Sequence, residues 1–144
     1  MSLPSSECSL CTTPGGALLW RDDRLRVVVV DEPGYPGFSR VIWNAHVQEM
    51  TDLPTADRRH LMGVVLEVEA ALRDLVGADK INLASLGNLT PHLHWHVIPR
   101  WRDDPHFPGS IWGERLREGA VRALPDFEAA LRERLGRLGR QVLG

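Results

Sequence analysis

The sequence predicts an α+β domain built on a five-stranded antiparallel sheet, with one long helix and a C-terminal helix. Five short apolar segments of strand length are separated by turns rich in Gly, Pro and Asp. A long amphipathic pattern with helical spacing lies between the third and fourth of these segments. Strands followed by a helix and then a hairpin are typical of an α+β fold with an antiparallel sheet.

The five strand segments are each bounded by turn residues. The first two are joined by the polar turn 21–24, and the third follows a loop rich in Pro and Gly at residues 31–37. The last two are joined by the tight connection 87–91. In chain order we expect strands at Ala17–Trp20, Leu25–Val30, Arg40–Trp43, Ile81–Leu86 and His92–Pro99.

The long helix is predicted to begin after Asp52, which we place as its cap, with Pro54 in its first turn and Gly77 at its end. Its apolar residues recur at helical spacing: Leu61, Val64, Val65, Val68, Leu72 and Leu75. A weaker helix begins near Pro125. Its apolar side is formed by Phe127, Leu131, Leu135 and Leu138.

The composition is that of an ordinary globular chain and excludes several classes of protein. Of 144 residues, 43% are hydrophobic and 25% are charged, which argues against disorder. The formal net charge of −2 gives no reason to expect a nucleic-acid or membrane partner. The first seven residues lack the basic start and apolar stretch of a secretory signal, and we expect a cytoplasmic protein.

The strongest functional signal is the alternation of histidine with apolar residues in the first part of the last strand. Side chains alternate between the faces of a strand, so His92, His94 and His96 should project on one side, with successive pairs ~6.6 Å apart. Leu93 and Trp95 should face the core. A neutral imidazole can attack a phosphorus atom and form a covalent phosphohistidine. The three rings could alternatively bind a catalytic zinc that activates water.

Three smaller signals accompany this strand. Cys8 and Cys11 are three positions apart, a spacing that suits metal ligation or redox chemistry in a cytoplasmic chain. His60 lies among polar residues of the long helix and is interpreted as a solvated surface residue. The segment around His106, with Trp112, is either a loop over the site or a packed tail, and we favour the loop.

The segment His92–Arg100 resembles the signature of the histidine triad (HIT) family. The resemblance extends to Gly37–His46, which is similar to the family strand that ends in a histidine, and to the cysteine pair, which resembles the zinc-binding start of many bacterial members. It covers roughly residues 8–100, which we take as the core of a single domain spanning residues 1–144, with 101–144 as a C-terminal extension. Leu89 stands where many relatives have Ser or Thr, and Asn88 stands in for Gln.

The resemblance implies roles for individual residues. His94 corresponds to the family nucleophile, and His96 is expected to hydrogen-bond the phosphate or the leaving group. Asp31 stands where the family places an acid on the ribose. The polar residues implied at the phosphate site are Asn82, Asn88 and Thr90. The ligands implied for a structural zinc are Cys8, Cys11, His46 and His92.

The implied activity is hydrolysis of a phosphoanhydride or phosphoramidate at a nucleotide α-phosphate, with release of a nucleoside monophosphate. Dinucleoside polyphosphates and nucleoside phosphoramidates are both open as substrates. No organic cofactor is expected, and the resemblance implies a homodimer, which would also protect a strand edge. A nucleotide-binding regulator without turnover is the non-enzymatic alternative.

Overall fold

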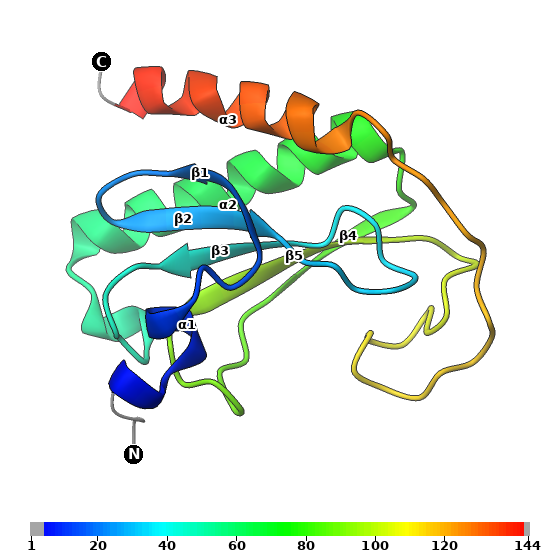
Figure 1. The fold of residues 1–144 in the computed structure, drawn as a ribbon, viewed down its shortest axis with the longest axis horizontal. Coiled ribbons are helices and arrows are strands. Elements are labelled where there is room, and N and C mark those ends of the chain that lie inside the picture. Colours follow the sequence, from blue (N-terminus) through cyan, green and yellow to red (C-terminus); the bar gives the residue numbers. More distant parts are fainter. Residues whose placement is uncertain (1–4, 143–144) are drawn as a thin grey trace.

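The computed structural model describes residues 5–142 (Figure 1). The first four residues, where we expected no secretory signal, and the last two lie outside the described residues. The five strands form one sheet, in the order β1-β2-β3-β5-β4, and every neighbouring pair is antiparallel. Their bounds are β1 Ala17–Arg21, β2 Leu25–Val29, β3 Ser39–Trp43, β4 Lys80–Ala84 and β5 His94–Arg100. The predicted five-stranded antiparallel α+β fold is confirmed.

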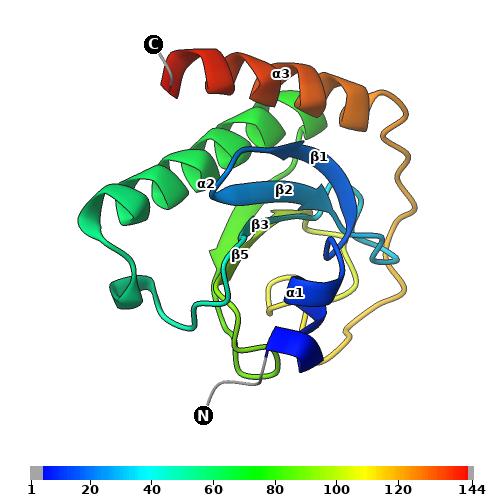
Figure 2. The same ribbon diagram turned by 60° about the vertical axis from the view of Figure 1, so that its left-hand side comes forward.

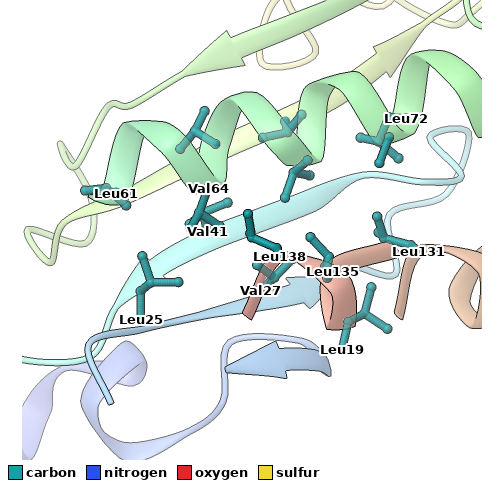
Figure 3. Close-up of a cluster of buried hydrophobic side chains, with 14 of the residues drawn as sticks. Leu19, Leu25, Val27, Val41, Leu61, Val64, Leu72, Leu131, Leu135 and Leu138 are labelled. Carbon is teal, nitrogen blue, oxygen red and sulfur yellow. The ribbon is translucent and has the colours of Figure 1, made fainter. Parts of the chain in front are cut away.

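Two helices, α2 (Thr55–Val76) and α3 (Phe127–Val142), cover one face of this sheet (Figures 1 and 2). Each buries a row of Leu or Val side chains at helical spacing. Figure 3 shows these rows meeting the strand side chains Leu19, Val27 and Val41 in the main hydrophobic core. The helices therefore pack on one face and leave the other face for a site.

The ends of α2 only partly follow the sequence prediction. Gly77 ends the helix in the left-handed conformation, with φ of 61°, as expected. Asp52 does not cap α2, however, because Pro54 occupies the N-cap position. The Asp52 carboxylate instead accepts a hydrogen bond from the backbone N–H of Glu49, in a capping box that starts the short 3₁₀ helix Met50–Asp52.

The expectation that His60 is a solvated surface residue is also wrong. Its ring is almost buried and bonds Asp22 at 2.6 Å, because α2 packs against the turn between β1 and β2.

The second face of the sheet is covered by two irregular segments. One is the N-terminal segment, which contains the short helix α1 (Ser9–Thr12) and packs Cys8 and Leu10 against Val28 and Ile42. The other is residues 101–125, which we call the strap. It leaves the end of β5, loops out at the right of Figure 1 and then turns up to α3.

A buried ion pair anchors the strap. The guanidinium of Arg100 donates hydrogen bonds to Asp104 at 2.8 and 3.1 Å, to Asn82 and to the carbonyl of Gly109. The Tyr35 hydroxyl lies 2.6 Å from Nδ1 of His106 and donates to Asp104 at 3.2 Å. The segment around His106 is thus held over the sheet and does not trail away. Within residues 5–142, no helix is long and apolar enough to cross a membrane.

Candidate functional site

The three histidines project from one face of the sheet, as the alternating pattern predicts. His94 and His96 lie on β5, and His92 immediately precedes it. All three are at least 93% buried, and the rings of His94 and His96 have their centroids 4.8 Å apart. Leu93, on the opposite side of the chain, joins the core beneath the helices.

His94 has one ring nitrogen fixed by the backbone. Its Nδ1 lies 2.5 Å from the carbonyl oxygen of His92, and a carbonyl can only accept, so Nδ1 carries the proton. In the neutral ring the lone pair is then on Nε2, the nitrogen that can attack. Burial lowers the pKa of His94 below its ordinary value of 6.5, and the hydrogen bond to His92 opposes this shift. The ring is consequently neutral at pH 7 and oriented as a nucleophile.

His96 is more strongly perturbed. Burial, the neighbouring His94 ring and the positive charge of Arg40 together lower its pKa to about 3. The His96 ring is therefore neutral at physiological pH and can donate one hydrogen bond. Its Nδ1 is buried without a hydrogen-bond partner among the described residues.

His92 faces a second cluster. Its Nε2 lies 2.6 Å from the carbonyl oxygen of Trp43, so Nε2 carries the proton and the lone pair of Nδ1 is free to bind a metal. That Nδ1 is 3.4 Å from each of the sulfurs of Cys8 and Cys11 and 3.3 Å from Nδ1 of His46. A hydrogen bond from the non-ligating nitrogen to a backbone carbonyl is the usual arrangement of a metal-bound histidine.

The dimensions of this cluster fit a tetrahedral zinc ion. Its four donor atoms, from Cys8, Cys11, His46 and His92, all lie within 4.8 Å of one another. Zinc bond lengths in a tetrahedron place two nitrogens about 3.3 Å apart and a sulfur and a nitrogen about 3.6 Å apart. The nitrogens of His46 and His92 are 3.3 Å apart, and the sulfur of Cys11 is 3.3 Å from Nδ1 of His46. The four ligands that the resemblance implied are thus brought together.

A pocket of about 230 Å³ opens beside His94 and His96. Two of the residues predicted at the phosphate site, Asn88 and Thr90, line it. Leu89 between them also lines the pocket and is 92% exposed, so this position offers the pocket an apolar side chain and no hydroxyl.

The other two predicted binding residues lie elsewhere. Asn82 is on β4, where its side-chain oxygen accepts a hydrogen bond from Arg100 at 2.8 Å. Asp31 is exposed and lines a separate cavity with Glu32, Tyr35 and Leu124. The structure does not bring either residue to the pocket beside His94.

Two pocket residues were missed by the sequence analysis. Arg40 lies directly opposite His96 in the β3–β5 register, and the ring of Trp112 lies 4.9 Å from the His96 ring. Arg40 could have been found, because it alternates with core-facing Val41 on a strand predicted to be next to the histidines. Trp112 comes from the strap, which has no periodic pattern. Its contact with His96 shows that the strap reaches the site, as favoured for the segment around His106.

Comparison with known proteins agrees with this architecture. The sequence profile of the HIT domain matches residues 16–103. An AP-4-A phosphorylase from Mycobacterium tuberculosis is 25% identical over 119 residues, 78% of this chain and 61% of the relative. The chain thus spans about three fifths of the length of the curated relatives it matches first.

Solved structures show the same fold. A histidine triad protein from Bradyrhizobium japonicum superposes with a TM-score of 0.72 at 27% identity, covering 84% of this chain and 91% of that protein. A Zn-bound histidine triad family protein from Mycobacterium smegmatis superposes with a TM-score of 0.64 at 21% identity, covering 96% of this chain and 99% of that protein.

Proposed function

The chain belongs to the HIT domain family, and from this premise we propose that it hydrolyses a nucleotide at its α-phosphate through a nucleotidyl-His94 intermediate. The observation that carries the proposal is the hydrogen bond from Nδ1 of His94 to the His92 carbonyl. It aligns the ring and leaves the lone pair on Nε2, beside a pocket lined by the polar side chains of Asn88 and Thr90. A neutral, oriented imidazole next to a pocket with polar side chains suits attack on phosphorus.

The reaction proceeds in two balanced steps. In the first, the lone pair on Nε2 of His94 forms a bond to the α-phosphorus, and the bond from phosphorus to the leaving oxygen or nitrogen breaks with its electron pair. A departing nitrogen also takes up a proton from solvent. In the second, water attacks the same phosphorus, and the phosphorus–nitrogen electron pair returns to His94. The nucleoside monophosphate leaves, and the water proton is released to solvent. His96 donates a hydrogen bond to the phosphate oxygens during both steps.

Zinc belongs to the structural cluster in this proposal. Cys8, Cys11, His46 and His92 supply four ligands and leave no open position for substrate, and two thiolates weaken the ion as a Lewis acid. The alternative catalytic zinc on the three triad histidines is disfavoured by the geometry. Nδ1 of His94 is occupied by the His92 carbonyl, and the lone pair of His92 points to the cysteines. The Zn-bound relative from Mycobacterium smegmatis supports zinc as the metal.

The decisive test is to trap the intermediate. The protein is mixed with diadenosine tetraphosphate or adenosine 5′-phosphoramidate, quenched within milliseconds and analysed by mass spectrometry for a nucleotidyl adduct on the His94 peptide. We expect the adduct in the wild type and its absence in His94→Ala, with turnover reduced at least about a thousandfold. His60→Ala, which removes an imidazole on the helix side of the sheet, is the matched control and should keep both. A protein that binds nucleotide but never turns over would instead be a regulator.

We further propose a homodimer that works in the cytoplasm on nucleotides, without a nucleic-acid or membrane partner. Strands β1 and β4 are the two edges of the sheet, and neither pairs with a further strand among the described residues. An open edge strand is commonly protected by pairing with another chain. Two unpaired cysteines suit a reducing compartment, where thiolates remain available for zinc.

A further inference from the structure

Arg40 differs from the other arginines on the histidine face of the sheet. Arg26 and Arg100 each donate four hydrogen bonds to protein oxygens. Arg40 donates a single one, from Nη1 to the carbonyl of Gly15 at 3.1 Å, and its Nε is buried without any acceptor among residues 5–142. Its guanidinium lies 5.8 Å from the centre of the Phe38 ring. A partly buried cation with so few partners is incompletely compensated.

The position of Arg40 connects this cation to the active site. Arg40 pairs with His96 across β3 and β5, while the nucleophile His94 pairs with Ile42. Directly opposite residues of an antiparallel pair share one face, so the Arg40 side chain lies beside His96. His96 is two residues along β5 from the nucleophile His94. That spacing is ~6.6 Å along the strand. Arg40, His94 and His96 line the same pocket.

The electrostatics of the pocket favour an anion at this place. Burial lowers the pKa of Arg40 and the carboxylate of Glu32 raises it, yet no ion pair forms between them in the described part of the chain. An arginine remains charged even when partly buried, because its intrinsic pKa is above 12. The guanidinium N–H groups of Arg40 that lack an acceptor therefore suit a phosphate oxygen, to which guanidinium groups bind strongly.

Building on the proposed function, we infer that Arg40 determines the leaving group by binding a second phosphate next to the attacked one. When the bond from the α-phosphorus to its bridging oxygen breaks, the electron pair stays on that oxygen and negative charge grows on the departing phosphate. A fixed guanidinium stabilises this charge, and no proton is required. A departing amine must instead take up a proton, and neutral His96 is a poor acid. The site is therefore matched to a polyphosphate substrate over a phosphoramidate.

The test compares two substrates that share the attacked adenylyl group. The ratio kcat/KM is measured for diadenosine tetraphosphate and for adenosine 5′-phosphoramidate in the wild type, Arg40→Gln and Arg59→Gln. Arg59 is exposed on α2, on the other face of the sheet, and its variant makes the same change of charge. We expect Arg40→Gln to lose about tenfold to a hundredfold in kcat/KM on the tetraphosphate and under about threefold on the phosphoramidate. Arg59→Gln should match the wild type on both.

Equal losses of kcat/KM on both substrates would overturn the inference. Arg40 would then either bind the attacked phosphate or have a purely structural role. A binding measurement separates this failure from failure of the proposed function. In the His94→Ala background, adenosine triphosphate should bind about tenfold more tightly than adenosine monophosphate, and adding Arg40→Gln should remove the difference. If the wild type hydrolyses neither substrate, the proposed function is wrong, and this binding difference alone decides the role of Arg40. Equal affinities for the two nucleotides would then reject it.

Discussion

At the scale of single residues, His92 connects two sites. Its ring faces the proposed zinc site through Nδ1, while its backbone carbonyl accepts a hydrogen bond from the ring of His94, the proposed nucleophile. A change at the metal cluster can therefore reach the nucleophile through one residue. The alternating histidines could be predicted from the sequence because strand geometry fixes which side chains share a face. The hydrogen bond from the His94 ring to the His92 carbonyl could not be predicted from the sequence, because it depends on the orientation of the ring.

Asp31 offers a residue-scale prediction about substrate binding. If its carboxylate binds the ribose, Asp31→Ala should weaken a ribonucleotide several-fold more than its 2′-deoxy analogue, since only the former has two adjacent hydroxyls to donate. Calorimetric titration of His94→Ala with both nucleotides measures this. Equal weakening of the two, or none, would mean that the exposed Asp31 is only a loop residue.

At the scale of elements, the face with the site depends on two segments that have little regular structure of their own. The N-terminal segment contributes Cys8 and Cys11 to the candidate metal cluster, and the strap is held by the Arg100–Asp104 pair. The strands and α2 were predictable because their apolar residues repeat with period two or 3.6. The strap has no such repeat, and its path is set by buried polar contacts, so the sequence favoured a loop over the site without indicating which residues hold it there.

Zinc removal should act on stability first. Cys8→Ser removes one of the four ligands, so the purified variant should contain substoichiometric zinc and melt several degrees lower than the wild type, because metal binding contributes to folding. Elemental analysis and calorimetry measure both quantities. His94→Ala provides the contrast and should retain its zinc. The opposite pattern, with zinc lost from His94→Ala and kept in Cys8→Ser, would reject both the structural cluster and the nucleophile.

The anchor of the strap should make stability depend on pH. Burial alone would raise the pKa of Asp104, but the hydrogen bonds from Arg100 and from three backbone N–H groups outweigh it and lower the pKa from 3.8 to about 2. A carboxylate with a lowered folded pKa contributes stability that is present above about pH 4 and is lost as the pH falls towards 2. Denaturant titrations between pH 2 and 5 should show this loss.

Asp104→Asn tests the origin of that dependence. The variant should lower the free energy of unfolding by about 3 kcal/mol or more at pH 7, because it leaves Arg100 buried without its counter-charge. It should also flatten the dependence between pH 2 and 4. A variant with wild-type stability at pH 7 would show that the ion pair does not anchor the strap.

At the scale of the whole molecule, the two faces of the sheet differ. We call the face covered by α2 and α3 the closed face, and the face that carries the three histidines the working face. The sequence predicted the closed face well, since the core-facing residues of α2, α3 and the strands follow simple periods. The working face was predicted only where a pattern or a family resemblance marked residues, as for the histidines and the zinc ligands. Arg40 lies in the site because it pairs opposite His96, and Trp112 lies there because of the path of the strap. Both depend on tertiary structure.

The oligomeric state is the prediction that belongs to this scale. We expect sedimentation equilibrium at micromolar concentration to give about twice the chain mass of 16.1 kDa, because β4 leaves a strand edge unprotected in the described part of the chain. A single species of 16.1 kDa at that concentration would contradict the dimer.

The contacts that complete the working face join parts of the chain that are far apart in sequence. Cys8 meets His92 across 84 positions, whereas the most distant strand pair of the sheet, Ser39 and Val97, is 58 positions apart. Closing long loops costs more entropy than closing short ones and slows folding. We therefore expect the sheet and α2 to form early during refolding, and the catalytic pocket to form late. In a refolding experiment, the recovery of nucleotide binding should lag behind the recovery of secondary structure, and added zinc should shorten that lag.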